Sequence, residues 1–187
     1  MRSQKNDGLK KMQRTLALYN MLANLFWSIV LLAPIFIFCF TLMTQKNVYI
    51  FLACSSIPFF LSNSFIDKMQ ISKTTKIYKK AGIDIVNRFA QNGSIINKLM
   101  KKKFPEYRAI SIEKKSILKL INQSYMFEKF HWMLFLFFNC VIVFAIIKNN
   151  FYWAFILLVG NVAYNVYPNL LQQYIRLKLK LFQKKIQ

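Results

Sequence analysis

Acidic residues are scarce in this 187-residue chain: six Asp and Glu stand against 27 Lys and Arg, for a net charge of +21. Glycine and proline are also few, at four each, and no segment is of low complexity. There is one histidine, and the three cysteines (Cys39, Cys54 and Cys140) lie apart in apolar runs without metal-ligand spacing. Neither a zinc or other metal site nor a disulfide framework is therefore expected.

Apolar residues, by contrast, are abundant: 56% of the chain is hydrophobic and 17% is aromatic. A soluble domain of this size could not bury so much apolar surface, and a disordered chain would not carry it. The basic residues are segregated from the long apolar runs, which disfavours a soluble nucleic-acid-binding protein. The composition instead predicts a membrane protein, with apolar residues in lipid and cations at anionic headgroups.

Four apolar runs are each about long enough to cross a hydrocarbon core of roughly 30 Å at 1.5 Å per residue. Very short linkers join the first run to the second and the third to the fourth, which makes two helical hairpins. The predicted fold class is all-α: a polytopic membrane protein with four transmembrane helices, in a single membrane domain over residues 1–187. The predicted spans are 21–43, 48–66, 131–147 and 151–171, and a basic, partly helical cytoplasmic or interfacial connection occupies residues 67–130.

The positions of the cations predict the orientation, because Lys and Arg collect on the cytoplasmic side of a membrane. All but two of the 27 lie in residues 1–20, in the connection, or in the tail after Leu171. The exceptions, Lys46 and Lys148, lie in the two hairpin loops. Four crossings place all three basic segments on one side. We therefore expect a multi-pass protein of the cell (inner) membrane with both termini in the cytoplasm.

The connection is too long to be a structureless linker in a compact protein. Apolar residues recur at helical spacing within residues 83–90, 95–100 and 117–125, and Gly93 and Pro105 separate these stretches. Basic amphipathic helices of this kind commonly lie in the headgroup plane. We therefore expect membrane lipids and anionic headgroups as partners.

Polar side chains form a stripe along one face of the fourth span and its extension. Its members are Asn161, Asn165, Asn169, Gln172 or Gln173, and Arg176. Pro168 interrupts the helical hydrogen-bond ladder within the stripe. Polar groups are costly in lipid and usually face the interior of a bundle. The stripe either binds neighbouring helices together or lines a substrate site.

The lone histidine, His131, lies three residues after Glu128 at the cytoplasmic end of the third span, so the two share a helix face. A carboxylate beside an imidazole fixes its tautomer and steadies the imidazolium, which makes His131 a candidate catalytic base. Alternatively, both are ordinary headgroup-level residues beside a membrane-interface anchor, Trp132. The polar stripe ends at the same depth, and this convergence favours a site with catalytic roles for His131 and Glu128.

The sequence contains no H-E-x-x-H, Walker or G-x-S-x-G motif and no pair of acidic residues within a span. Metal-dependent hydrolysis, ATP-driven transport and ion-coupled transport are therefore disfavoured. A histidine base that activates a hydroxyl toward a thioester suits the remaining groups. No bound cofactor is expected; acyl-CoA or a similar acyl donor would be a co-substrate, with its phosphates attracted by Lys101, Lys102, Lys103 or Arg108.

Two short elements resemble the glycosyl-4,4′-diaponeurosporenoate acyltransferase family, which includes the enzyme that acylates the sugar of a glycosylated carotenoid in staphyloxanthin-type synthesis. They are the Glu128-x-x-His131-Trp132 element and the polar stretch that runs from Asn165 through Gln172, Gln173, Tyr174 and Arg176. The resemblance extends over residues 65 to 180. It departs from the family pattern at Gln173, where Arg is usual, and at Ile175, where Asn is usual.

The resemblance implies a membrane acyltransferase that moves a fatty acyl group onto a glycosylated lipid, carotenoid-like or other, at the inner leaflet. His131 would be the base and Glu128 its orienting partner. The implied substrate-binding residues are Asn165, Gln172, Gln173, Tyr174 and Arg176. The alternative is a non-enzymatic membrane scaffold or subunit that binds a partner or anionic lipids, with the asparagine stripe holding its helices together.

Overall fold

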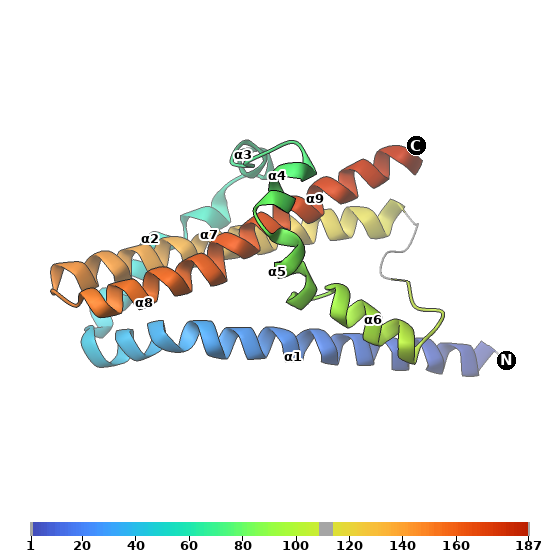
Figure 1. Cartoon of the computed structure of the whole chain (residues 1–187), viewed down its shortest axis with the longest axis horizontal. Coiled ribbons are helices and arrows are strands. Elements are labelled where there is room, and N and C mark those ends of the chain that lie inside the picture. Colours follow the sequence, from blue (N-terminus) through green and yellow to red (C-terminus); the bar gives the residue numbers. More distant parts are fainter. Residues whose placement is uncertain (1, 109–113, 187) are drawn as a thin grey trace.

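In the computed structural model, which describes residues 2–108 and 114–186, every regular element is helical (Figure 1). Three long helical segments form the body of the molecule. They are α1 (Arg2–Leu42), α7 (Lys114–Ile147), and α8 (Phe151–Asn161) continued by a π-turn (Val162–Val166) into α9 (Tyr167–Ile186). Stretches of all three, Asp7–Leu42, Ile117–Ile147 and Phe151–Lys184, have the length and hydropathy of membrane spans. The all-α prediction is confirmed, and the first, third and fourth predicted spans lie in these segments.

The second predicted span, 48–66, is not one spanning helix. It divides into α2 (Gln45–Ser55), a 3₁₀-turn (Ile57–Phe60) and α3 (Asn63–Lys68). Pro58 has no N–H to continue the α-helical ladder, and the Ser62 hydroxyl accepts a hydrogen bond from the Phe65 amide that begins α3. The 11 residues of α2 reach about 16 Å at 1.5 Å per residue, about half of a hydrocarbon core. The four-span prediction is therefore corrected to three candidate spans, with α2 and the 3₁₀-turn packed along α7.

The apolar core lies where α1, α7 and α8 meet. Phe38, Phe138, Val141, Ala145 and Leu157 are fully or almost fully buried there. Many other large apolar side chains on the same helices point outward, and examples are Phe40, Ile147 and Phe155. So much exposed apolar surface would be unfavourable in water, which supports membrane association.

The central connection forms short helices that pack against the body. They are α3, α4 (Thr75–Lys80), α5 (Ile83–Phe89) and α6 (Ser94–Lys103). α4 and α5 pack on α9, whereas α6 packs on α1. The predicted helical stretches in the connection are confirmed, and their apolar faces are used within the protein: Ile96 and Met100 are buried in a cluster that includes Tyr19 of α1.

Glycine ends α4 and separates α5 from α6 for different reasons. Gly82 has φ +79°, a left-handed conformation that side chains with a Cβ disfavour. At Gly93 a Cβ would lie 2.2 Å from the Asn87 carbonyl oxygen, so the turn has no room for a side chain. These two turns direct α5 and α6 along the body, toward α9 and α1 respectively.

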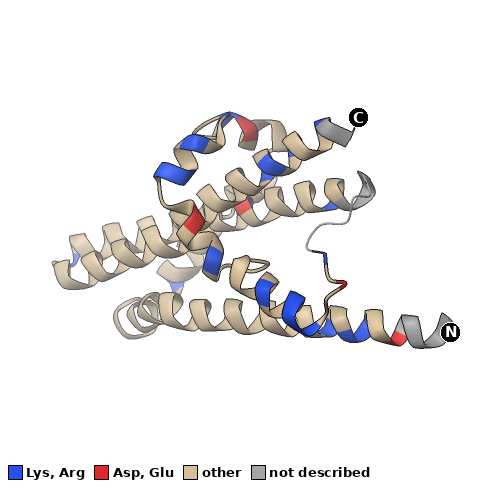
Figure 2. Cartoon of the chain, turned by 45° about the vertical axis from the view of Figure 1, so that its right-hand side comes forward, with Lys and Arg blue, Asp and Glu red and all other residues tan. Residues whose placement is uncertain are grey.

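Both ends of the described chain lie at the same end of the molecule, away from the α1–α2 and α7–α8 turns (Figure 1). Lys and Arg gather toward that end on α6, on the first part of α1 and on α9 (Figure 2). This arrangement is the one that the positive-inside argument requires. The cytoplasmic orientation itself stays a prediction.

Candidate active site

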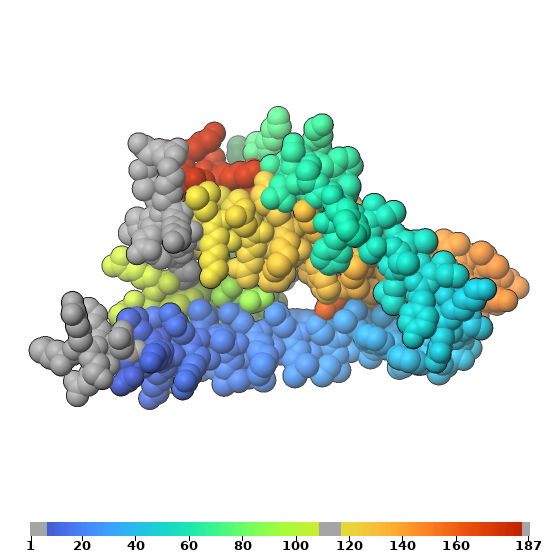
Figure 3. Space-filling view, turned by 180° about the vertical axis from the view of Figure 1, so that it is seen from behind, coloured from blue at the N-terminus to red at the C-terminus, as the bar shows by residue number. Residues whose placement is uncertain are grey.

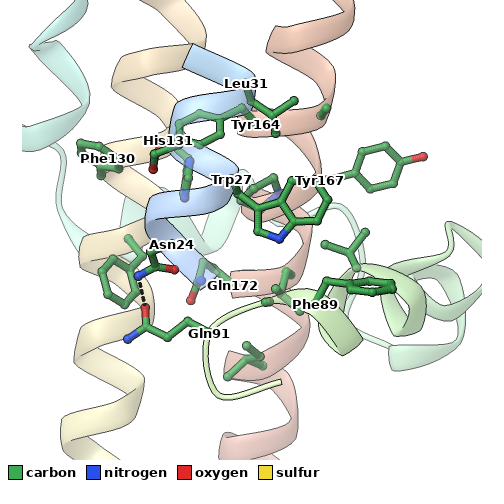
Figure 4. A pocket seen from close by; sticks show the side chains of 18 of the residues that line it. Asn24, Trp27, Leu31, Phe89, Gln91, Phe130, His131, Tyr164, Tyr167 and Gln172 are labelled. Carbon is green, nitrogen blue, oxygen red and sulfur yellow. Dashed lines mark hydrogen bonds between the residues drawn. The ribbon is translucent and has the colours of Figure 1, made fainter. Parts of the chain in front are cut away.

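A pocket of about 760 Å³ opens between α1, α5, α7 and the π-turn with α9 (Figure 4). Its walls are mainly aromatic and aliphatic side chains. The described residues that line it include no Lys, Arg, Asp or Glu, although the chain carries a net charge of +21. Its polar lining consists of Asn24, Ser28, Gln91, His131, Tyr164, Tyr167 and Gln172.

His131, the candidate base from the sequence, lies on the pocket wall, where a ligand can reach it. Its ring packs edge-on against Phe130 and Tyr164, with centroids 5.4 Å and 5.7 Å away. Its Nδ1 is buried and has no hydrogen-bond partner among the described residues. The Tyr164 hydroxyl is 2.9 Å from the Ser28 hydroxyl, and this hydrogen bond links the part of the pocket wall around His131 to α1. Of the two ring nitrogens, Nδ1 is thus the buried one, while the residue as a whole lines the pocket.

Glu128 does not pair with His131. Its side chain is fully buried; Oε1 accepts a hydrogen bond from Gln173 Nε2 at 2.7 Å, and Oε2 accepts one from Arg176 at 2.5 Å. Because α7 and α8–α9 are antiparallel, residues one turn apart on α7 face different turns of the polar stripe. Glu128 therefore meets the Gln173–Arg176 turn, whereas His131 lies one turn further along, beside Asn165.

Arg176 is the centre of a buried ion-pair network. Besides Glu128, its guanidinium contacts Asp67 (Nε to Oδ1, 3.2 Å) and lies 4.2 Å from the centroid of the Tyr125 ring. Lys180 and the Tyr125 hydroxyl both donate to Asp67, at 2.9 Å and 2.7 Å. Two carboxylates and a π-face thus compensate the buried cation, as a charge removed from water requires.

The Asp67 carboxyl is the member of this network outside the candidate spans. Partial burial acts to raise its pKa. The hydrogen bonds from Tyr125 and Lys180, with the positive charges of Lys180 and Arg176, outweigh that effect and hold the pKa below its usual value. Asp67 is therefore ionised over the neutral range and binds the start of the connection to α9.

Gln173 and Tyr174 also belong to the scaffold. Gln173 Oε1 accepts hydrogen bonds from the Tyr78 hydroxyl at 3.0 Å and from the Ile71 amide at 3.2 Å. The Tyr174 hydroxyl donates to Asp84 at 3.0 Å. The Gln173 amide oxygen thus binds two groups of the connection. Through these bonds Gln173 holds α4 against α9, and Tyr174 holds α5 against α9. Of the residues predicted in the C-terminal element, Gln172 is the one that lines the pocket.

Asn165 and Asn161 form a ladder beside His131. Asn165, fully buried, donates from Nδ2 to Asn161 Oδ1 at 2.8 Å, and Asn161 donates from Nδ2 to the Phe135 carbonyl at 3.3 Å. The second of these bonds joins α8 to α7, as expected of an asparagine that holds helices together. Asn165 Oδ1 is buried and has no partner among the described residues.

The π-turn at Val162–Val166 explains how these side chains reach the pocket. Pro168 has no N–H for the carbonyl of Tyr164, four residues earlier, and its ring would collide with that carbonyl in a regular α-helix. A single wider turn relieves the conflict. It turns Tyr164 toward the pocket and Asn165 toward α7. The π-turn is the interruption of the helical ladder that the sequence predicted at Pro168, and Pro168 itself lines the pocket.

Several residues of this region were missed from the sequence. On the pocket side they are Asn24, Trp27, Ser28 and Gln91. On the network side they are Asp67, Tyr78, Asp84, Tyr125 and Lys180. The scarcity of acidic residues was a usable signal for the second group, because three of six, Asp67, Asp84 and Glu128, contact α9.

Metal chemistry has no candidate centre in this region: within the described residues no group of three or more His, Cys, Asp and Glu side chains is placed to hold an ion. Trp132, the alternative interface anchor, packs inward against the cluster of Ile66, Ile117 and Leu179. The pocket is thus a largely apolar site with one imidazole and a few neutral hydrogen-bonding groups.

Comparison with known proteins supplies one match. The model of the glycosyl-4,4′-diaponeurosporenoate acyltransferase family matches residues 62–185, which is more than half of the chain. No curated protein and no solved structure matches significantly. The matched range includes α7, α9 and the connection, whereas α1, which supplies one wall of the pocket, precedes it.

Proposed function

Because this chain belongs to the glycosyl-4,4′-diaponeurosporenoate acyltransferase family, we propose that it transfers a fatty acyl group to a hydroxyl of a glycosylated lipid in the pocket described above. The observation that carries the proposal is the lone histidine, His131, on the wall of an apolar pocket of about 760 Å³. The acceptor is carotenoid-like or another glycolipid, and the reaction takes place at the inner leaflet.

In this mechanism His131 is the general base. Its Nε2 removes the proton from the acceptor hydroxyl while the oxygen attacks the thioester carbonyl of acyl-CoA or a similar donor. The tetrahedral intermediate collapses, the carbon–sulfur bond breaks, and the imidazolium returns the proton to the departing thiolate. The oxygen–acyl bond of the product replaces the sulfur–acyl bond of the donor, so no other reactant is needed.

The lining of the pocket supports an uncharged headgroup attached to apolar chains. His131 and Tyr164 lie toward one part of the pocket, and Asn24, Gln91 and Gln172 toward another (Figure 4). Neutral amides that donate and accept hydrogen bonds suit sugar hydroxyls, and the indole of Trp27 supplies a flat apolar surface beside them. A phosphate in this place would find no Lys or Arg among the described lining residues.

The remaining predicted site residues support the site instead of touching the ligand. Glu128, Gln173, Tyr174 and Arg176 hold α9 against α7 and the connection. Their effect on the reaction is to place the opposite face of α9, with Pro168 and Gln172, along the pocket. We propose this supporting role in place of direct substrate binding.

The basic surface of α6 and α1 is the proposed contact with anionic groups. α6 packs on α1, so Lys101, Lys102 and Lys103 lie near the basic first part of α1 (Figure 2). We propose that this surface meets anionic headgroups on the cytoplasmic side of the cell (inner) membrane and attracts the phosphates of the acyl donor. Both termini lie on that side in this proposal.

The test is mass spectrometry of total lipids from cells that carry the intact protein, His131→Ala, Lys129→Ala or no protein. A lipid that gains one fatty-acyl mass in the intact and Lys129→Ala strains, and not in the other two, identifies the reaction and its acceptor. Lys129→Ala is the matched control, because it neighbours the histidine without lining the pocket. Identical lipids in all four strains, at equal membrane levels of protein, contradict the proposal and favour a non-enzymatic scaffold.

A further inference from the structure

Two buried atoms on neighbouring side chains lack hydrogen-bond partners among the described residues: Nδ1 of His131 and Oδ1 of Asn165. The Asn165 side chain and the Tyr164 backbone carbonyl are the polar neighbours of the imidazole, although no bond of good geometry joins either of them to Nδ1. A buried donor or acceptor that is left unpaired destabilises the folded protein. Two such atoms on neighbouring side chains can satisfy each other if they pair during function.

The direction of that pair follows from the amide ladder behind Asn165. The ladder begins at the Phe135 carbonyl, which can accept a hydrogen bond and cannot donate one. Asn161 must therefore present its Nδ2 to Phe135, at 3.3 Å, which turns its Oδ1 toward Asn165. Asn165 must in turn present its Nδ2 to Asn161, at 2.8 Å, which leaves Oδ1 for the imidazole. A backbone carbonyl thus sets the orientation of both amides.

We infer that Asn165 is the positioning residue that fixes the tautomer of His131: Asn165 Oδ1 accepts a hydrogen bond from the Nδ1–H, and Nε2 is left unprotonated toward the pocket. This inference rests on the proposed function for its purpose, because an Nε2 lone pair is what a general base needs there. The Asn165 oxygen takes the place that the sequence assigned to the Glu128 carboxylate.

The arrangement has a chemical consequence. A neutral amide oxygen orients the imidazole without adding a negative charge beside it, so the ring is held neutral and ready to accept a proton at Nε2. The polar chain of two amides and a backbone carbonyl also contains no titratable group that could take up the proton, so the proton taken from the acceptor stays on the imidazole until the thiolate leaves. The Glu128 carboxylate remains committed to Arg176.

The lone histidine makes a direct test possible. Protein with isotopically labelled histidine, purified in detergent without substrate, has a single imidazole whose two nitrogen NMR signals report which nitrogen carries the proton. At a pH above the imidazole titration we expect a protonated Nδ1 and a pyridine-type Nε2 in the unmodified protein. A protonated Nε2 in that sample overturns the inference, whatever any variant does.

Variants sharpen the test. Asn165→Leu removes the acceptor and Asn161→Leu removes its anchor, so both should shift the histidine toward the Nε2–H tautomer. The matched control is Asn139→Leu, because Asn139 also donates to the Phe135 carbonyl, at 2.8 Å, but stands outside the ladder. The control should keep the Nδ1–H tautomer. An unchanged tautomer in folded Asn165→Leu contradicts the inference.

Kinetics separate this inference from the proposed function. With an acylatable glycolipid, Asn165→Leu should lower kcat by about tenfold or more, as the loss of a correctly oriented base does, with little change in KM. An Nδ1–H tautomer in a protein that leaves all lipids unchanged supports the ladder and contradicts acyl transfer. An Nε2–H tautomer in an active enzyme supports acyl transfer and contradicts the ladder.

Discussion

The two faces of α9 differ in how their polar groups are used. On one face, Gln173, Arg176 and Lys180 find charged or hydrogen-bonding partners within the protein. On the other, Gln172 lines an apolar pocket and has no hydrogen bond to the described residues. Seen from behind, α7 and the connection lie in front of most of α9 (Figure 3). The difference teaches that the charged side chains of α9 serve to hold the helices together, while a neutral side chain beside them faces the pocket.

The largest effect should come from breaking the scaffold face at its centre. Arg176→Met leaves Glu128 buried and Asp67 without one of its cations, and loss of one partner of a buried ion pair typically costs about 3–5 kcal/mol. We expect a large fall in the melting temperature of the purified protein and a low membrane level. The double variant Arg176→Met with Glu128→Met should recover part of the loss, since it removes the uncompensated charge. No recovery would mean that Arg176 acts through Asp67.

The adjacent pair Gln172 and Gln173 offers the sharpest contrast between the faces. Gln173→Leu should lower the unfolding free energy by about 1–3 kcal/mol, because it leaves buried donors and an acceptor unpaired. Gln172→Leu should leave the melting temperature unchanged and raise KM for the glycolipid by about tenfold, the value of one hydrogen bond of about 1.4 kcal/mol. Thermal unfolding and acyl-transfer kinetics on both variants decide this. Equal effects on stability would show that the faces are not distinct.

Pro168 lies between the faces, and its replacement tests the π-turn. Pro168→Ala restores an N–H that can donate to the Tyr164 carbonyl and removes the ring that collides with it. Both changes favour a regular α-helical turn over the π-turn. Such a shift rotates Tyr164 and Asn165 away from His131. We expect kcat to fall several-fold while the protein folds normally. Asn169→Ala, one residue further along on the buried side, is the comparison that separates turn geometry from general disturbance of α9.

The smallest effect concerns the dependence of the scaffold on pH. The Asp67 pKa is depressed in the folded protein, so its contribution to stability is fully present above the unfolded-state pKa, about 4. It is lost as the pH falls through the folded-state pKa. The difference in melting temperature between the unmodified protein and Asp67→Asn should therefore be constant above about pH 4 and narrow below it. A difference that widens on acidification would contradict the sign of the shift.

Much of the fold follows from periodicity and hydropathy. The long apolar runs predicted three of the helical segments, and the apolar spacing within residues 83–90, 95–100 and 117–125 predicted helices within the connection. The second span was wrong because hydropathy does not register the effect of Pro58 and Ser62 on helix continuity. A run of apolar residues has the length of a span only if its backbone hydrogen bonds continue through it.

The sequence indicated which residues face the interior of the bundle, but it did not indicate how they pair with one another. His131, Gln172 and the polar stripe were identified, and the stripe's ambiguous member proved to be Gln173, since that side chain and Arg176 are the buried ones. The pairing of Glu128 with His131 was inferred from spacing on one helix. Spacing shows which residues share a face, but it does not show which of them a neighbouring helix supplies with a stronger partner. Arg176 is that partner for Glu128.

The sequence by itself determined the helical class, the segregation of charge and the buried face of the last helix, because these depend on local periodicity and on the cost of polar groups in an apolar environment. The tertiary structure alone decided which acid meets which base, that α1 closes one wall of the pocket, and that Asn165 lies beside His131. Those outcomes depend on the antiparallel register of α7 against α8–α9 and on a π-turn, and a shift of one turn in either would exchange the partners.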